Sequence, residues 1–233
     1  MTAKVALVTA ASKGIGAGVA HELRDRGYQL ALLARGEEVE TLADKLGGIA
    51  QRGDVTDELA LHALVDRALE RWGRIDVVVA NTGHPAKGKP LAIAEAEWRT
   101  GYELILESAI RLSRLASPAM IAQRSGAFVF ISSYAAARPD IARPVSTVFR
   151  AALAAWVKVL AEELAPHGAR ANAVLPGFID SQSVSQVIVD TIPLGRVGTV
   201  AELARTVALL ASDDASFVTG QCLLVDGGMV RSL

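Results

Sequence analysis

Short apolar segments alternate with longer segments of helical periodicity along the chain, and this alternation constrains the fold more than any other feature. Short apolar runs in such a pattern indicate strands that are covered on both faces. They occur at Val5–Val8, Leu30–Leu33, Ile75–Val79, Phe128–Ile131, Ala171–Leu175 and Cys222–Val225, with a weaker candidate at Ile49–Arg52. Because no linker or repeat interrupts the pattern, we predict one α/β domain over residues 1–233. The expected fold is doubly wound, with a mainly parallel seven-stranded sheet and helices on both faces.

Helical periodicity predicts most of the connections between these strands. The expected helices are Ile15–Arg26, Leu59–Trp72, Trp98–Arg124, Val145–Leu164 and a final helix that begins at Thr199. Thr199 and Glu202 have the spacing of a capping box, in which each side chain accepts a hydrogen bond from the other residue's backbone N–H.

The expected helix over residues 145–164 carries two apolar stripes, whereas a surface helix of a monomer needs only one. One stripe consists of Leu153, Trp156, Leu160 and Leu164, and the other of Val148, Ala151, Ala152, Ala155 and Val159. The second stripe predicts a homo-oligomer, a dimer or tetramer, that forms through this helix. A covering loop of the same chain is the alternative.

Charge and composition argue against several classes of partner. The formal net charge is −1 and no basic run occurs, so nucleic acid is not an expected partner. The single cysteine, Cys222, excludes an internal disulfide and fits a reducing compartment. We find no signal-like N-terminus, no run of about 18 apolar residues and no metal-ligand spacing. We therefore expect a cytoplasmic protein without a membrane or metal partner.

The first expected strand leads directly into a glycine-containing turn, Thr9–Gly16, with the sequence TAASKGIG. Gly14 and Gly16 allow the backbone to approach a ligand closely, so that free N–H groups at the start of the next helix can bind a pyrophosphate. A buried strand before the turn and an amphipathic helix after it favour this interpretation over an ordinary turn.

Motifs from residue 4 to about residue 230 resemble the short-chain dehydrogenase/reductase family, in particular its β-ketoacyl-acyl-carrier-protein reductase branch. The turn resembles the family's TGxxxGxG fingerprint, with Ala10 at the first glycine, and Ala80–Gly83 resembles its NNAG segment. The TGQ and VDGG motifs near the end of the chain are typical of that branch. The resemblance implies a Rossmann-type domain whose dinucleotide site includes Thr9, Ser12, Lys13, Gly14, Ile15, Gly16, Asp54, Val55, Asn81, Gly83, Pro176, Gly177 and Ile179.

The end of the second expected strand favours NADP(H) over NAD. NAD-specific sites place Asp or Glu there to bind the ribose 2′-hydroxyl, whereas a 2′-phosphate requires positive charge. This strand ends in Arg35, with no acid until Glu37. Lys13 resembles the second basic residue of NADP-preferring members of the family, and the two cations are expected to converge on one phosphate.

Of the family's four catalytic residues, a Ser, a Tyr, a Lys and an Asn, only the Ser is retained. Ser133 occupies the serine position, and the family's spacing places Ser146 at the tyrosine, Arg150 at the lysine and Ile105 at the asparagine. A serine hydroxyl is shorter and far less acidic than a phenol. Arg150 keeps the positive charge and could still donate a hydrogen bond to the nicotinamide ribose, but arginine is a poor proton donor.

Two other side chains are candidate acids near the expected reaction centre. Tyr134 follows Ser133 directly, and His84 follows Gly83 beside the expected nicotinamide position. The alternatives are an exposed loop tyrosine and a solvated histidine. The loop Phe178–Ile192 is expected to cover a partly apolar substrate pocket.

Three functions remain open, because function depends on the site rather than the fold. The one we favour is an NADP(H)-dependent oxidoreductase that transfers hydride between the nicotinamide and a carbonyl or alcohol. Its acid would be non-standard: Tyr134, His84, or water with Arg150. The second is a catalytically silent cofactor-binding sensor or partner subunit, and the third is a non-redox lyase or isomerase. The small-molecule substrate is not identified.

Overall fold

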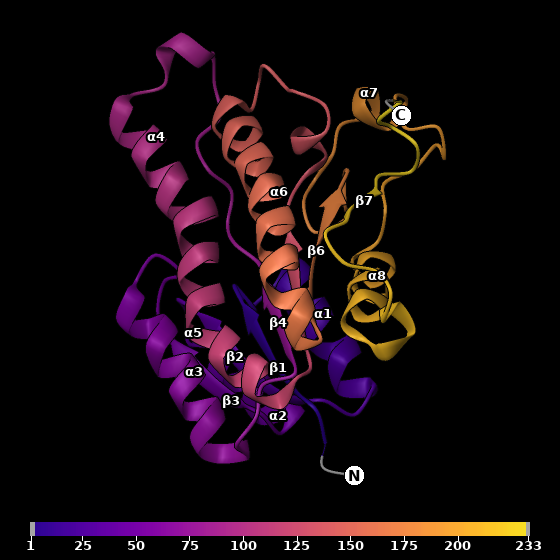
Figure 1. Cartoon of the computed structure of the whole chain (residues 1–233). Helices are drawn as coiled ribbons and strands as arrows, with labels where there is room; N and C mark the ends of the chain where they lie inside the picture. The colour runs from indigo at the N-terminus through magenta and orange to yellow at the C-terminus, as the bar shows by residue number, and fades with distance from the viewer. Residues whose placement is uncertain (1–2, 232–233) are drawn as a thin grey trace.

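The computed structural model describes residues 3–231, which form a seven-stranded parallel sheet between two layers of helices (Figure 1). The fold class predicted from the sequence is confirmed. The strands are β1 (Val5–Thr9), β2 (Gln29–Ala34), β3 (Ile49–Arg52), β4 (Val77–Ala80), β5 (Gly126–Ile131), β6 (Ala169–Pro176) and β7 (Cys222–Val225).

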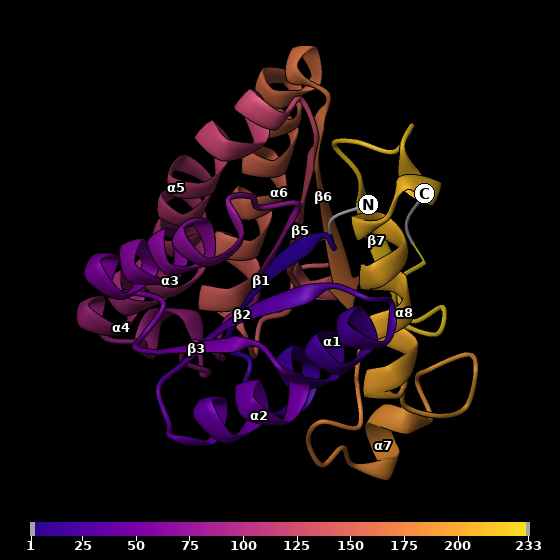
Figure 2. The ribbon, with the colours of Figure 1, turned by 90° about the horizontal axis from the view of Figure 1, so that it is seen from below.

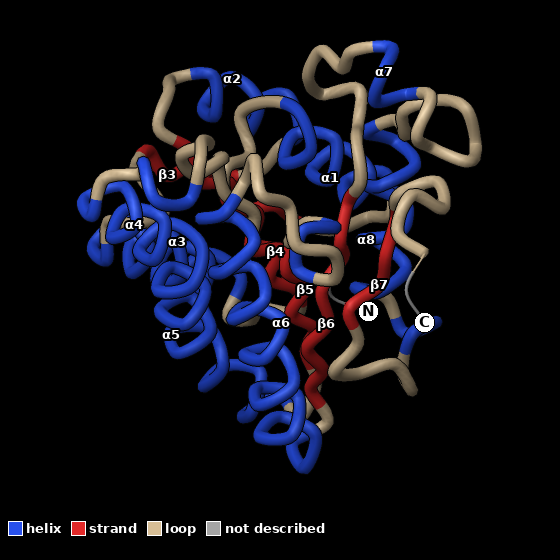
Figure 3. The backbone as a smooth tube through the Cα atoms, turned by 90° about the horizontal axis from the view of Figure 1, so that it is seen from above, coloured by secondary structure: helices blue, strands red, loops and turns tan. Residues whose placement is uncertain are grey.

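The strand order determines where a ligand can bind. The order is β3-β2-β1-β4-β5-β6-β7, and every neighbouring pair is parallel. Figure 3 shows β4, β5, β6 and β7 side by side in this order. From β1 the chain adds β2 and β3 on one side of the sheet, and then β4, β5, β6 and β7 on the other. The direction of strand addition reverses between β1 and β4. In doubly wound sheets ligands bind at the carboxyl ends of the strands on either side of this reversal.

Helices cover both faces of the sheet. The sheet separates two hydrophobic cores. Helices α3, α5 and α6 pack on one face of the sheet, and α1, α2 and α8 pack on the other (Figure 2). The helices are α1 (Gly14–Asp25), α2 (Glu38–Leu46), α3 (Glu58–Trp72), α4 (Glu95–Tyr102), α5 (Ser108–Gln123), α6 (Pro144–Leu164), α7 (Gln186–Val189) and α8 (Val200–Ala211).

Most expected boundaries agree with the structure to within two residues. The strands at Ile49–Arg52 and Cys222–Val225 coincide, and the capping box at Thr199 and Glu202 is present. Helix α2 was not predicted, although its buried residues Val39, Ala43 and Leu46 have helical spacing. The helix is only nine residues long and buries only these three, so its apolar face is short. The short α7, inside the loop that was expected to cover the substrate pocket, buries none of its residues.

The expected helix Trp98–Arg124 is wrong in detail. Helical structure begins at Glu95, and a π-helical segment, Glu103–Glu107, separates α4 from α5. A π-segment inserts an extra residue per turn, which rotates the side chains that follow and often marks a functional site. Here it faces Leu104 toward a cleft and buries Ile105.

Helix α6 has one buried and one exposed apolar face. Leu153, Leu160 and Leu164 are buried, whereas Val148 and Val159 are about half exposed, at 49% and 58%. No loop of residues 3–231 covers the second stripe, which removes the intrachain alternative. Within that part of the chain, the helical stretch Pro144–His167 is the one that is long and apolar enough to cross a membrane, and its packing on the sheet gives the apolarity another cause.

A buried asparagine joins β6 to the loop before β7. The side chain of Asn172 is fully buried; its Nδ2 donates to the Val218 carbonyl at 2.8 Å, and its Oδ1 accepts from the Gln221 N–H at 3.0 Å. Together these bonds fix the edge of the sheet that carries the Pro176–Gly177 loop.

We predict that Asn172→Ala lowers the free energy of unfolding by about 2–3 kcal/mol, because a carbonyl and an N–H lose their shared partner. Urea denaturation followed by circular dichroism measures the change. The control is Gln221→Ala: its side chain bonds only the Thr219 carbonyl at the surface, so a loss below about 0.5 kcal/mol is expected. Equal effects of the two variants would contradict the role given to Asn172.

Candidate active site

A cleft of about 770 Å³ opens at the carboxyl ends of β1, β2, β4, β5 and β6, on both sides of the strand reversal. This volume is within the range of small-molecule sites. We call its two ends the turn end, at Ser12–Ile15 after β1, and the serine end, at Ser132, Ser133 and Ser146 after β5 and at the start of α6. The chain segment before α6 lies with α7 at the same end of the molecule (Figure 1).

The turn end leaves the N-terminus of α1 free to bind an anion. Lys13 is extended and makes no side-chain cap, and the first turn of α1 contains no acid. A Cβ added at Gly16 would lie 2.2 Å from the Ala10 carbonyl oxygen, so only glycine permits this close packing. Free N–H groups and the helix dipole at such an N-terminus suit a phosphate.

Ala10 has a φ of +47°, in the left-handed region that glycine adopts without cost. This is the position where the family's fingerprint has its first glycine. The Asn81 side chain holds the Ala10 carbonyl by donating from Nδ2 at 3.3 Å. The departure from the motif therefore keeps the turn's geometry.

Thr9 and Gly16 shape the cleft without lining it, although both were expected in the dinucleotide site. The Thr9 side chain is buried; its hydroxyl donates to the Asn81 carbonyl at 2.7 Å and accepts from the Asn81 N–H at 2.9 Å. It thus joins the ends of β1 and β4. The other expected residues do line the cleft: Ser12, Lys13, Gly14, Ile15, Arg35, Asp54, Val55, Asn81, Gly83, Arg150, Pro176, Gly177 and Ile179.

Charged groups surround the turn end. Lys13 is exposed, and the Arg35 side chain is 79% exposed with its Nη1 3.6 Å from Asp54 Oδ2. Glu38, at the start of α2, also lines this end, and its carboxylate packs directly against Gly36. The two cations are accessible to a 2′-phosphate, while Glu38 is an acid that the sequence analysis did not consider there.

At the serine end, Ser133, Ser146 and Arg150 face one cleft, as the family's spacing predicted. Ser133 Oγ accepts from the Ala135 N–H at 3.2 Å and starts a short 3-10 turn. Ser132, which the sequence analysis did not single out, also lines the cleft, and its buried Oγ has no hydrogen-bond partner among the described residues.

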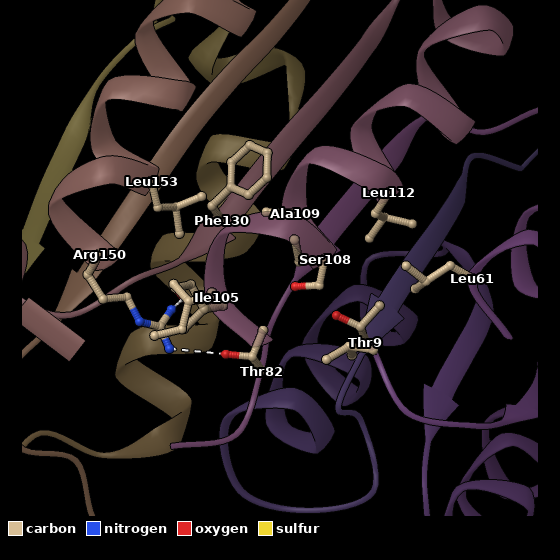
Figure 4. A pocket seen from close by; sticks show the side chains of 13 residues that line it. Thr9, Leu61, Thr82, Ile105, Ser108, Ala109, Leu112, Phe130, Arg150 and Leu153 are labelled. Atoms are coloured by element: carbon tan, nitrogen blue, oxygen red, sulfur yellow. Dashed lines mark hydrogen bonds between the residues drawn. The ribbon is translucent and has the colours of Figure 1, made fainter. Parts of the chain in front are cut away.

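Arg150 is almost fully buried and has no carboxylate partner within residues 3–231. Its Nη1 donates to the Ile131 carbonyl and its Nη2 to Thr82 Oγ1 at 3.1 Å, while Nε is unpaired (Figure 4). Burial lowers the pKa of Arg150 to about 10, so the guanidinium stays charged at neutral pH. It supplies an uncompensated positive charge to this end of the cleft.

Behind Arg150 lies a cavity of about 10 Å³, lined by Ile105, Ser108 and Thr82 (Figure 4). A cavity of that size holds about one water molecule. Ile105 contributes only apolar atoms to it, so any water there would depend on the arginine and the neighbouring hydroxyls. Thr82, which stands where the family motif has alanine, anchors Arg150 and was not anticipated.

Tyr134 is tethered by two neighbours. Its hydroxyl donates to Asp140 Oδ2 at 2.6 Å and accepts from Arg143 Nη1 at 2.6 Å. Burial, followed by the hydrogen bond to Asp140, raises the pKa of Tyr134 to about 12. The phenol lines the cleft, as expected, but is a weaker acid than a free tyrosine.

His84 lines the serine end and is exposed. Partial desolvation, then the positive charges of Lys87, Arg150 and Arg143, lower the pKa of His84. The imidazole is therefore neutral at pH 7, and the depressed pKa makes protonation require a more acidic solution than for a free histidine.

The loop after β6 covers less of the cleft than the sequence suggested. Phe178, Ile179, Ser181 and Gln182 line it, but Val187, an apolar residue of the same loop, is 76% exposed and does not line the cleft. Sequence reasoning also missed Arg143, since nothing in its local pattern distinguishes it from a surface cation. In residues 3–231 no group of three or more His, Cys, Asp or Glu could hold a metal ion.

A doubly wound sheet with a glycine turn at its strand reversal defines the Rossmann class of nucleotide-binding domains. The profile of the enoyl-(acyl carrier protein) reductase family matches residues 9–230. The chain therefore belongs to the short-chain dehydrogenase/reductase family, and its curated relatives place it near the ketoacyl reductase branch.

Two relatives span almost the whole chain. The oxidoreductase UcpA of Salmonella typhimurium is 34% identical over 251 residues, covering 98% of this chain and 95% of the relative. The 3-oxoacyl-[acyl-carrier-protein] reductase FabG of Escherichia coli is 33% identical over 236 residues, covering 97% of each.

Solved structures agree with this assignment. L-sorbose reductase from Gluconobacter frateurii, complexed with NADPH and L-sorbose, superposes with a TM-score of 0.93 at 28% identity, covering 100% of this chain and 98% of that one. YwfH, an NADPH-dependent reductase involved in bacilysin biosynthesis, superposes with a TM-score of 0.94 at 26% identity, covering 99% and 100%.

Proposed function

We propose that this protein is an NADP(H)-dependent oxidoreductase that transfers hydride between the nicotinamide and a carbonyl or alcohol by a non-standard proton route. One observation carries the proposal: a single cleft joins an uncapped, glycine-rich helix N-terminus to a buried arginine that has no carboxylate partner among the described residues and shares the cleft with two serine hydroxyls. The first feature suits a pyrophosphate and the second suits negative charge that develops on a substrate oxygen.

The residues fit the dinucleotide at both ends. N–H groups at the start of α1 would hold the pyrophosphate, Lys13 and Arg35 a 2′-phosphate, and Arg150 would hold the nicotinamide end. The bound cofactor supplies or accepts the hydride. In the reduction direction, Ser133 donates a hydrogen bond to the carbonyl oxygen, the shorter Ser146 acts through a bound water, and the charge of Arg150 stabilises the alkoxide that develops there.

The proton that completes alcohol formation comes from water at the two serines. Tyr134 is a poor donor because its pKa is about 12 and its proton is already shared with Asp140. His84 is neutral at pH 7, since its pKa is lowered. Water bound beside a fixed cation is a weaker general acid than the family's tyrosine, so turnover slower than that of a tyrosine-containing relative is expected.

The second candidate is a silent cofactor-binding sensor or partner subunit. The observation that favours it is that polar groups near the expected reaction centre are already hydrogen-bonded within the protein: the Tyr134 hydroxyl to Asp140, and the Arg150 guanidinium to Ile131 and Thr82. Such a protein would bind the dinucleotide and transfer no hydride.

Turnover of NADPH with a panel of ketones, quinones and ketoacyl thioesters separates the two candidates. We expect slow oxidation of NADPH that follows ketone reduction, detected by absorbance at 340 nm and by product analysis. The triple variant Ile105→Asn, Ser146→Tyr, Arg150→Lys restores the family's residues and should raise kcat by at least tenfold, since general acid catalysis contributes about 10²–10⁴-fold. Tight NADPH binding without turnover of any panel member would contradict the oxidoreductase proposal and support the silent cofactor-binding protein.

Cofactor choice depends on the charges at the turn end. Lys13→Ala and Arg35→Ala should each weaken NADPH binding by about 10–100-fold, the loss of one charge-assisted hydrogen bond, and leave NADH binding nearly unchanged. Glu38→Gln should strengthen NADPH binding, because it removes a carboxylate from the same end of the cleft. Fluorescence titration measures all three. A parallel loss for both dinucleotides would contradict a 2′-phosphate site.

We also propose that the exposed face of α6 packs against α6 of a second copy. Its alanines, Ala151 and Ala155, would allow close helix approach between the flanking valines, and a twofold axis lets one stripe serve both subunits. The double variant Val148→Glu, Val159→Glu should shift the protein to a monomer in light scattering. Leu59→Glu, at a leucine on α3 that is still more exposed, at 79%, should not. A monomeric wild-type protein would refute the proposal.

A further inference from the structure

The cations that line the cleft form two groups, Lys13 and Arg35 at the turn end and Arg143 and Arg150 at the serine end. Arg150 is assigned above to the nicotinamide end of the dinucleotide, but Arg143 has no assigned function. The acids that line the cleft, Glu38 and Asp54, both lie at the turn end. The serine end is lined by the cations Arg143 and Arg150 and by the neutral His84, and no acid of the described chain lines it. Asp140 offsets the charge of Arg143, with which it forms an ion pair, but the charge of Arg150 is not offset. The serine end therefore has a net positive charge.

Arg143 has unused hydrogen-bond donors. It precedes α6 by one residue, and its Nη1 donates to both Tyr134 and Asp140 at 2.6 Å. No hydrogen bond to another described residue is made by its Nε or Nη2. These two atoms form one edge of the planar guanidinium, the edge that binds the two oxygens of a carboxylate or phosphate in parallel.

The guanidinium of Arg143 is held in place. Its Cζ lies 5.2 Å from the centre of the Phe178 ring and 5.9 Å from that of Tyr134, and the two rings are 5.6 Å apart. The ion pair with Asp140 at 2.6 Å fixes the third side. An arginine fixed in this way loses little conformational entropy on binding an anion.

The other residues of this region suit the rest of a small substrate. Phe178 and Tyr134 offer apolar ring surface in the same cleft as Ser133 and Ser146. A molecule held at one end by Arg143 therefore meets apolar surface and then the hydroxyls of the proposed reaction centre.

We propose that the substrate carries an oxyanion, a carboxylate or a phosphate, that binds the free edge of Arg143. The proposal rests on the proposed function and adds the chemical class of the carbonyl or alcohol. Arg143 is a specificity-determining residue here, since it contacts the anionic group and not the reacting carbon.

The test measures binding to protein saturated with NADP⁺, by calorimetry, so that no turnover is needed. The probes are pyruvate, acetoacetate and levulinate, each with its methyl ester, and dihydroxyacetone phosphate with dihydroxyacetone. At least one anionic probe should bind tenfold or more tightly than its neutral counterpart, the effect of a charge-assisted pair. The keto acid and phosphate arms identify which oxyanion is preferred.

Variants assign the preference to Arg143. Arg143→Gln leaves Asp140 unpaired, so the double variant Arg143→Gln, Asp140→Asn keeps the local charge balanced; it should abolish the preference. Arg143→Lys should retain part of it, and Asp140→Asn alone should increase it. The matched control is Arg138→Gln, an exposed arginine of the same segment that lies outside the cleft lining, and it should bind like the wild type.

The outcomes separate the two proposals. NADP⁺ binding without any anion preference, or a preference that survives in the double variant, overturns the role of Arg143 and leaves the dinucleotide function intact. Failure to bind either NADP⁺ or NADPH overturns the proposed function itself. Near-ultraviolet circular dichroism of each variant confirms that the rings around Tyr134 remain packed.

Discussion

The hydroxyl of Thr9 bonds both backbone polar groups of Asn81, and these two hydrogen bonds close β1 against β4 where the strand order reverses. Every feature of the cleft is placed relative to this junction. The turn end follows β1 on one side, and the Asn81–Gly83 segment leads to the serine end on the other. A buried hydroxyl that satisfies a donor and an acceptor at once keeps the strand ends together without a side chain occupying the cleft.

The charge of Arg150 is the second organising interaction. Burial of a cation without a carboxylate is costly, and here the cost is reduced by the Ile131 carbonyl and the Thr82 hydroxyl rather than by an opposite charge. The charge therefore remains available to a ligand. The same arrangement accounts for Thr82 in the segment after β4. The guanidinium of Arg150 is longer than the lysine side chain of the family, and it needs a hydrogen-bond acceptor there that the alanine of the family motif cannot provide.

The sequence predicted the scaffold better than the chemistry. Buried strands and amphipathic helices show as periodic patterns, so the sheet and most boundaries could be anticipated. Helix α2 was missed because its amphipathic pattern spans only nine residues. The family's spacing correctly brought Ser133, Ser146 and Arg150 into one cleft. It could not show that Tyr134 is held by Asp140 and Arg143, since those contacts depend on how a loop folds back over six to nine residues. For the same reason Arg143 was indistinguishable from a surface cation.

Ala10 adds backbone strain to the turn after β1. A non-glycine residue at positive φ stores about 1–2 kcal/mol, which the Asn81 amide and the packing of Gly16 retain in the folded state. A segment that carries strain is expected to open at a lower free-energy cost than the sheet around it. An anion bound to its free N–H groups would selectively suppress that opening, and hydrogen exchange at this turn would then report occupancy of the cleft before any change in global stability does.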